Sequence, residues 1–340
     1  MVEKLAQIII GMQNFSDNLK KDMKNPLHSI AGFLLLFTIA IVSTGSCYAA
    51  SQYNVIILKF ATHPALDELE VNFRSSLNAH VTNVFIETLN ANGNPVSAKQ
   101  LAESATRPGI DLIVTLATPA SQAVAKTPSD IPLLYAAVSD PDGAHVVLPR
   151  STGIQNVNSN IVKQALQTIT NLYPKATRIG TIYNPTEQNS VFVQDLIKSE
   201  CTAMNLILEQ RTVSDPNQFP ATVEQLRPQI DVLYCANDNL VNKGALSIAR
   251  TAQVLKLPFV IGELSTVSKG AVAGIGVEYS SMGQHLGDLA AQILTRKPND
   301  PLPPREPPPK PQFWLNMPVA KEIGLEIPQE ILQKTDKILP

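Results

Sequence analysis

Residues 111–125 read DLIVTLATPASQAVA, and this stretch shows the pattern that decides the fold. A short, almost continuous apolar run comes first, and short polar residues with a proline follow it directly. An unbroken apolar strand is typical of a parallel sheet that helices cover on both faces, whereas a strand with one wet face alternates. The stretch therefore predicts a buried parallel strand that ends in a polar turn, where a helix begins.

The same pattern recurs along most of the chain from Asn54 onward. The segments between the apolar runs carry apolar residues three and four positions apart, as in Leu66, Leu69, Phe73 and Leu77, which predicts core-facing helices. Regular alternation of strand and helix predicts parallel sheets with right-handed crossovers. The predicted strands are Asn54–Phe60, Val84–Leu89, Asp111–Leu116, Leu133–Val138, Arg178–Tyr183, Leu206–Thr212, Asp231–Ala236, Phe259–Gly262 and Val272–Val277.

The strand–helix units fall into two series. With 340 residues the chain is too long for one ordinary core. The first series ends near residues 151–158, and the second begins at Arg178. The predicted fold class is therefore α/β, with two doubly wound parallel-sheet lobes. Residues 298–311 hold eight prolines, which predicts a stiff connector, and residues 312–317 then predict one more strand.

Composition excludes several classes of function. The chain is 44% hydrophobic and 16% charged, with a formal net charge of −2 and no run of Lys or Arg, so we expect no nucleic-acid partner. It has no CxxC motif and no histidine cluster, so we expect no metal and no other cofactor. It also lacks a GxSxG elbow, a P-loop and a GxGxxG motif, so we expect a protein that is not an enzyme.

The N-terminus has the pattern of a secretory signal. Three lysines precede an apolar run of 13 residues from Ile30 to Val42, and small residues follow up to Ala50. The run is shorter than the roughly 20 residues that span a bilayer. We expect residues 1–49 to be a signal segment that is cleaved near Ala49 and directs the protein to the periplasm. Met23 is an alternative start for this segment. An uncleaved anchor and a lipoprotein attached through Cys47 are the alternatives.

Two further cysteines, Cys201 and Cys235, remain in the exported part of the chain. An oxidising compartment permits them to pair. Cys201 lies on the apolar face of a predicted helix and Cys235 in a predicted strand. Their surroundings favour two buried thiols that serve packing, and the sequence leaves pairing open.

Polar residues gather where the predicted strands end. Ligands of parallel α/β sheets bind outside the carboxyl ends of the strands, and helices that begin there offer free N–H groups to an anion. Helix capping alone explains any single position as well as ligand contact does. Short polar side chains recur at these strand ends, and Asp140, Asp238 and Glu263 among them could face an ammonium.

Several of these segments resemble one known family. The matching stretches are residues 63–67 (HPALD), 117–123 (ATPASQA), 137–141 (AVSDP) and 178–184 (RIGTIYN), followed by Asn189-Ser190, Asp238-Asn239, residues 268–271 (SKGA) and the late Asn316, Ala320 and Ile323-Gly324. In this order and spacing they resemble the ABC-transporter substrate-binding proteins that include tryptophan- and tyrosine-binding lipoproteins. The chain differs in having Glu263 where the family often has an Asp, and Glu278-Tyr279-Ser280 where it often has Asp-Tyr-Tyr.

The resemblance implies a type I periplasmic-binding fold with a multi-strand hinge. It implies three crossings between the lobes, with lobe 1 made of residues 53–153 and 276–298 and lobe 2 of residues 154–275 and 306–320. Residues 321–340 would then form a C-terminal tail. We expect a monomer. The resemblance marks the following candidate ligand-binding residues, with no catalytic or metal site among them: His63, Thr118, Ala120, Ser139, Asp140, Asn184, Asn189, Ser190, Asp238 and Glu263.

The function that the resemblance implies is capture of a small polar solute, such as an amino acid, for an ABC permease in the inner membrane. Closure of the two lobes over the ligand would be favoured because only the closed state makes both sets of contacts. In this hypothesis Thr118 or Ser190 holds the carboxylate of the solute and Asp238 its ammonium. The alternative is a sensor of the same fold that delivers its ligand to a signalling protein.

Overall fold

The computed structural model describes residues 52–297 and 299–340. Its first sheet has five strands in the order β2-β1-β3-β4-β5, all parallel. Every residue of the two central strands β3 and β4 is buried, as their unbroken apolar sequences predict. The strands are β1 (Tyr53–Lys59), β2 (Val84–Asn90), β3 (Leu112–Leu116), β4 (Leu133–Val138) and β5 (Ser151–Gln155).

The second sheet has seven strands in the order β12-β11-β10-β9-β8-β6-β7. All its pairings are parallel except that of β10 with β11, which is antiparallel. Two mostly parallel sheets confirm the predicted α/β class with two lobes. The strands are β6 (Arg178–Tyr183), β7 (Ile207–Thr212), β8 (Val232–Cys235), β9 (Phe259–Ile261), β10 (Ala273–Gly276), β11 (Gln312–Asn316) and β12 (Lys337–Leu339).

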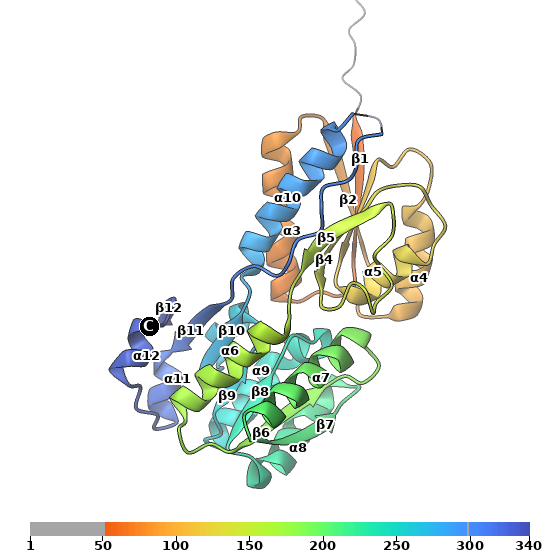
Figure 1. Cartoon of the computed structure of the whole chain (residues 1–340). Coiled ribbons are helices and arrows are strands. Elements are labelled where there is room, and N and C mark those ends of the chain that lie inside the picture. Colours follow the sequence, from red (N-terminus) through yellow and green to blue (C-terminus); the bar gives the residue numbers. More distant parts are fainter. Residues whose placement is uncertain (1–51, 298) are drawn as a thin grey trace, which may run out of the picture. The chain divides into compact units, whose positions relative to one another are not determined.

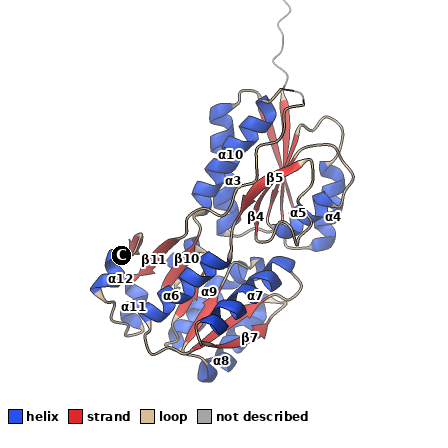
Figure 2. Ribbon diagram, in the orientation of Figure 1, coloured by secondary structure: helices blue, strands red, loops and turns tan. Residues whose placement is uncertain are grey.

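Helices cover the sheets (Figures 1 and 2). Beside the first sheet α3 and α10 lie side by side, as do α4 and α5, and α6 with α7 and α8 with α9 pack in pairs beside the second. The helices are α3 (Pro64–His80), α4 (Pro95–Ala105), α5 (Thr118–Ala125), α6 (Ser159–Leu172), α7 (Gln188–Ala203), α8 (Phe219–Leu226), α9 (Asn239–Val254), α10 (Tyr279–Thr295), α11 (Met317–Glu322) and α12 (Gln329–Gln333).

The close approach of α3 and α10 depends on two glycines. A Cβ atom at Gly283 would collide with the backbone carbonyl of Leu69, and one at Gly287 would press on Ser76. The pairing brings α10, which follows the second sheet's β10 in sequence, onto the helix that follows β1. The chain thus returns to the first sheet late in its sequence and leaves again to form β11.

Two strands were not predicted. Residues 151–155, interpreted above as the division between the two series, form the edge strand β5. Residues 337–339, within the predicted tail, pair with β11 as β12. Both are short edge strands, and Ser151–Gln155 contains a glycine, so neither has the continuous apolar run on which the prediction depended.

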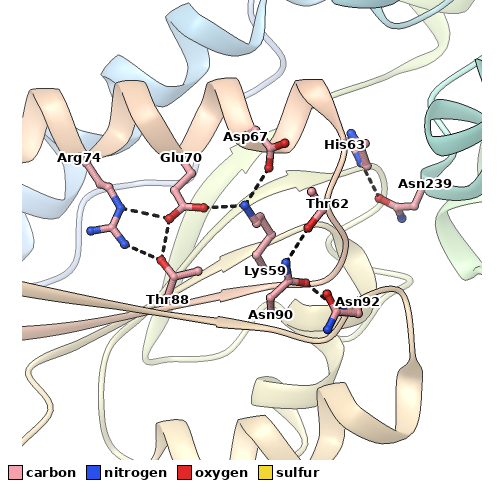
Figure 3. Close-up of polar contacts among 10 residues, drawn as sticks. All are labelled: Lys59, Thr62, His63, Asp67, Glu70, Arg74, Thr88, Asn90, Asn92 and Asn239. Carbon is pink, nitrogen blue, oxygen red and sulfur yellow. Dashed lines mark hydrogen bonds and ion pairs between the residues drawn. The ribbon is translucent and has the colours of Figure 1, made fainter. Parts of the chain in front are cut away.

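An ion-pair cluster fixes the start of α3 against the first sheet (Figure 3). The Lys59 ammonium at the end of β1 lies 2.8 Å from Asp67 Oδ1 and 2.7 Å from Glu70 Oε2. Glu70 also accepts hydrogen bonds from Arg74 and from the Thr88 hydroxyl on β2. Because Lys59 is buried, these two carboxylates are the partners its charge requires. The cluster therefore sets the position of the turn that precedes α3.

Candidate functional site

An inner cavity lies where strands of both sheets end. His63 and Leu66 come from the start of α3, Ala117 follows β3, Ala137 is the penultimate residue of β4, and the second sheet contributes the turn after β8. Parallel α/β folds bind their ligands at this edge. The lining residues are His63, Leu66, Ala117, Ala137, Ser139, Asn156, Asn189, Asn237, Asp238, Asn239, Asn242 and Tyr279.

The inner cavity is small in this structure, at about 10 Å³. A space of that size accommodates about one water molecule. An amino acid therefore requires the lining to move apart before it can enter. Lobes that open and close around a ligand provide such movement.

Polar atoms without a partner concentrate at the inner cavity. The side-chain oxygens of Asn189, Asn237 and Asn242 are buried and have no hydrogen bond among the described residues, and the same is true of Nδ1 of His63. The Thr118 hydroxyl, at the start of α5, is also unpaired, although Thr118 does not line the inner cavity. Leaving a buried polar group unpaired costs about 1–3 kcal/mol. The four unpaired groups that line the inner cavity therefore favour a polar ligand there.

The backbone at this edge is unusual at two alanines. Ala117 has φ of 80° and Ala137 has φ of 57°, in the left-handed region that a non-glycine residue enters at a cost of about 1–2 kcal/mol. Ala117 directly follows β3, Ala137 is the last residue but one of β4, and both line the inner cavity. Strained residues of this kind cluster at ligand clamps.

A buried network joins the segments near residues 139, 156 and 279. The Ser139 hydroxyl donates to the side-chain oxygen of Asn156 at 3.2 Å, and the Asn156 amide donates to the Tyr279 hydroxyl at 3.2 Å. Tyr279 begins α10, and Asn156 follows β5. Two separate crossings of the chain are thereby tied together beside the inner cavity.

The Asp238 carboxylate already accepts four hydrogen bonds from within the protein. One carboxylate oxygen caps α9 through the N–H groups of Leu240 and Val241, and the other accepts from the Asn184 N–H at 2.7 Å and from the Ser190 hydroxyl at 2.6 Å. A carboxylate offers about four lone-pair positions, and all of them are used. This geometry favours a role in positioning the turn, and contact of Asp238 with a ligand ammonium stays a prediction.

The ten predicted site residues divide into those that line a cavity and those that do not. His63, Ser139, Asn189 and Asp238 line the inner cavity, and Asn184 lines the outer cavity described below. The remaining five line neither of these two cavities. Glu263 caps the short helix at Leu264–Lys269, and Asp140 accepts from the Gly143 N–H and, at 3.4 Å, from Gln188. The last three are buried at helix starts and are Thr118, Ala120 and Ser190.

An outer cavity of about 270 Å³ adjoins the inner one. Asn239 lines both cavities, and its side-chain oxygen lies 3.3 Å from Nε2 of His63 (Figure 3). Nearby, Glu187 accepts from the side-chain amides of Asn239 and Asn184. The lining residues are Phe60, Ala61, Thr62, Asn92, Gly93, Pro95, Asn184, Thr186, Glu187, Ser214, Asn239, Leu240 and Lys243.

Burial shifts the protonation of the two titratable groups in this contact. It lowers the pKa of His63 to about 4, so its imidazole is neutral at neutral pH. Burial, with the charge of Asp238 beside it, raises the pKa of Glu187 to about 7. No group of three or more metal-ligating side chains occurs within residues 52–297 and 299–340.

The family model for ABC transporter substrate binding proteins matches residues 54–339. The chain belongs to this family. The match covers both sheets and every residue that lines the two cavities. In the described part of this family member no helix has the length and apolarity that a membrane span needs, and the predicted signal segment and Cys47 lie outside the described residues.

Three similar proteins illustrate the family. The tyrosine-binding protein of Clostridioides difficile (strain R20291) is 29% identical over 72% of this chain and 74% of its own length. An ABC domain from Streptococcus pneumonia, solved in complex with L-Trp, is 25% identical with a TM-score of 0.79. A conserved domain protein from Vibrio cholerae is 26% identical with a TM-score of 0.80. Each of the two structures is matched over 85% of this chain and 100% of its own.

The sequence prediction missed several residues that line the inner cavity of this substrate-binding protein. Asn237 lies two residues after β8, and Asn242 lies one helical turn after Asp238, so the strand-end rule combined with helical spacing would have found both. Asn156 was missed because β5 was not predicted. Tyr279 follows the predicted strand Val272–Val277 and lies in the segment that differs from the family, but the sequence alone did not assign it to the site, since its place beside the cavity depends on α10 returning to α3.

Proposed function

We propose that this protein captures an amino acid with an aromatic side chain in the inner cavity and passes it to an ABC permease. The observation that carries the proposal is the set of buried, unpartnered amide and hydroxyl groups at the strand ends. A free amino acid brings both donors and acceptors on its ammonium and carboxylate, which amides and hydroxyls can pair. The ligands of the two relatives named above, tyrosine and L-Trp, support the aromatic class.

Calorimetric titration with L-tryptophan and with L-tyrosine tests the proposal. We expect one site per chain, and Asn189→Ala to weaken binding at least tenfold, which is about 1.4 kcal/mol. The Asn189 side-chain oxygen is buried without a partner, and its NH₂ group donates a long 3.5 Å hydrogen bond to Ser190, so the variant should change the free energy of unfolding of the ligand-free protein by less than about 1 kcal/mol. The matched control is Asn160→Ala, an exposed residue in the first turn of α6. If neither amino acid binds the parent protein, the proposed ligand class is wrong.

We place the site residues and the lobe boundaries in the same proposal. His63, Ser139 and Asn189 would contact the ligand, and Thr118 and Ser190 lie at helix starts where a carboxylate is stabilised. Lobe 1 would comprise residues 53–153 and 276–298, and lobe 2 residues 154–275 and 306–320. The hinge would then lie at the chain crossings, where Asn156 and Tyr279 meet.

The cellular role that we propose is import. The protein would be exported through the signal in residues 1–49, act as a monomer without catalysis, and dock on a permease in the inner membrane. Two observations support a carrier over an enzyme: His63 contacts an amide instead of a nucleophile, and the family is defined by solute binding. Genes for a permease and an ATPase beside this one would favour import, and a kinase or cyclase gene would favour sensing.

A further inference from the structure

Three side chains form a continuous chain of hydrogen bonds between the inner and outer cavities. Glu187 precedes α7, Asn239 begins α9, and His63 precedes α3. The Asn239 amide donates to Glu187 Oε2, and its oxygen lies 3.3 Å from Nε2 of His63. Glu187 and His63 are both buried, with exposures of 8% and 4%. Sequence motifs gave no reason to connect these three residues, which come from different strand ends.

The chemistry of the groups fixes the direction of these hydrogen bonds. An ionised carboxylate can only accept, so it takes the N–H of the Asn239 amide and turns the amide oxygen toward His63. That oxygen also only accepts, so Nε2 of His63 must carry the proton. A neutral imidazole has one N–H, and Nδ1 is therefore left as an acceptor. Nδ1 is buried and has no donor within the described residues, and His63 lines the inner cavity.

We propose that Glu187 and Asn239 are positioning residues that set the tautomer of His63, so that Nδ1 presents a hydrogen-bond acceptor to the inner cavity. The tautomer itself does not require a ligand. The role of Nδ1 toward a donor group of the amino acid, such as its ammonium, rests on the proposed function. The same contact joins α3 to α9 beside the outer cavity, so it also holds together elements that pack on different sheets.

The clearest consequence of the proposal is that the hydrogen bonds between Glu187, Asn239 and His63 can be reversed in direction. A neutral group at residue 187 that can donate would turn the Asn239 amide around, so that its N–H faces His63. Nε2 must then accept, and the proton moves to Nδ1, which becomes a donor toward the cavity. Glu187→Gln places such a donor there with almost no change in shape. Asn184, whose side-chain oxygen accepts from the Thr186 N–H, keeps donating to the one oxygen that remains at residue 187, so the new NH₂ group faces Asn239.

Charged and polar groups from several elements surround the hydrogen-bonded side chains of Glu187, Asn239 and His63. Asp238 faces Glu187, and the side-chain amides of Asn184 and Asn189 also lie beside it. Asp67, Lys59 and Lys269 surround His63 at longer range. These groups differ little in their effect on the two ring nitrogens of a neutral imidazole. The direct contact with Asn239 therefore decides between the tautomers.

The test is NMR of the ligand-free full chain labelled with ¹⁵N-histidine, at pH 8, where Glu187 is mainly ionised. The long-range ¹H–¹⁵N pattern of an imidazole distinguishes the two tautomers, and His63→Asn identifies the His63 signals among five histidines. We expect the Nε2–H form in the parent protein and a shift of the population to Nδ1–H in Glu187→Gln. Glu103→Gln, an exposed carboxylate on α4 away from the contact, is the matched control and should keep Nε2–H.

Two results would overturn the proposal: an Nδ1–H form in the parent protein, or an unchanged Nε2–H form in folded Glu187→Gln. Asn239→Ala supplies a second check, since loss of the amide should leave a mixture of both tautomers, and a pure Nε2–H form would contradict the assignment. Because these spectra need no ligand, they stand apart from the calorimetry of the proposed function. If tryptophan or tyrosine binds, Glu187→Gln should also weaken that binding severalfold, while Glu103→Gln should not.

Discussion

The Ser190 hydroxyl donates a 2.6 Å hydrogen bond to Asp238, whose other carboxylate oxygen caps helix α9. The carboxylate thereby links the start of α7 to the start of α9, and its buried charge is balanced by four donors. Loss of a helix cap alone costs about 1 kcal/mol, and hydrogen bonds to a charged group contribute about 1.5–3 kcal/mol each. Asp238, which the sequence suggested as an ammonium ligand, therefore mainly stabilises the structure of the site.

Asp238→Ala should therefore lower the free energy of unfolding of the ligand-free protein by at least about 2 kcal/mol. Urea denaturation followed by circular dichroism measures this. Asp195→Ala, an exposed carboxylate on α7, serves as control and should change stability by less than about 0.5 kcal/mol. Unchanged stability in Asp238→Ala together with lost ligand binding would assign the residue to direct ligand contact instead.

Tyr279→Phe should lower the free energy of unfolding by about 1 kcal/mol, because the Asn156 amide loses its buried acceptor. The variant should also weaken ligand binding, since the Ser139–Asn156 pair beside the inner cavity loses its support. Thermal unfolding and calorimetry measure the two effects. Tyr53→Phe, on a half-buried residue that starts β1, is the control. Binding unchanged in Tyr279→Phe would exclude the network from the site.

Gly283→Ala should destabilise the protein by more than about 2 kcal/mol, because the added methyl group meets the Leu69 carbonyl where α3 and α10 cross. Gly324→Ala offers a contrast, since it has open space around it but a positive φ of 77°, and should cost about 1 kcal/mol. Denaturation curves of the two variants give the comparison. A smaller loss at Gly283 than at Gly324 would contradict the close packing of the two helices.

Cys201 and Cys235 should stay reduced in the folded protein. Both are buried and free, and burial raises their pKa values to about 11 and about 12, so little thiolate exists at neutral pH. With Cys47 replaced by Ser, we expect no fast reaction with a thiol reagent in buffer and two reactive thiols in denaturant. Fast reaction of either cysteine in the native protein would refute this.

The raised pKa of Glu187 makes a prediction for stability against pH. Between its unfolded value near 4.5 and its folded value of about 7, the folded protein binds more protons than the unfolded chain. Its contribution to stability is therefore full below pH 4.5 and falls as pH rises toward 7. His63, whose folded pKa is about 4, contributes the opposite slope between about 4 and 6.5.

Replacing Glu187 by Gln removes the contribution to stability that falls as the pH rises and leaves the contribution of His63 in place. The free energy of unfolding of Glu187→Gln should accordingly rise more steeply with pH from 4.5 to 7 than that of the parent protein. Urea denaturation at a series of pH values measures both slopes, and the exposed Glu103→Gln is again the control. Parallel curves would show that Glu187 titrates normally.

The sequence predicted the central strands well because their residues are buried on both faces and read as unbroken apolar runs. Arg178–Tyr183 and Leu133–Val138 were predicted at the bounds that the structure has. The edge strands β5 and β12 were missed, since a half-exposed strand of three to five residues lacks that run. Edge pairing depends on a neighbour that the local sequence does not show.

The candidate site was predictable to the level of strand ends and no further. His63, Ser139 and Asn189 follow the rule that ligands bind beyond the carboxyl ends of parallel strands, and they do line the inner cavity. The rule does not distinguish a residue that faces the cavity from one that caps a helix, as Asp238 and Glu263 show. It also does not place Tyr279 beside the cavity, although this residue follows a predicted strand, because its position depends on the return of α10.

Native mass spectrometry of the protein purified from cells tests the central claim most directly. If the protein is an amino-acid carrier, we expect a complex one small molecule heavier than the bare chain, or such a complex after incubation with tryptophan or tyrosine. Collisional activation should then release the ligand and leave the mass of the free protein. A bare chain before and after incubation with all twenty amino acids would contradict the account.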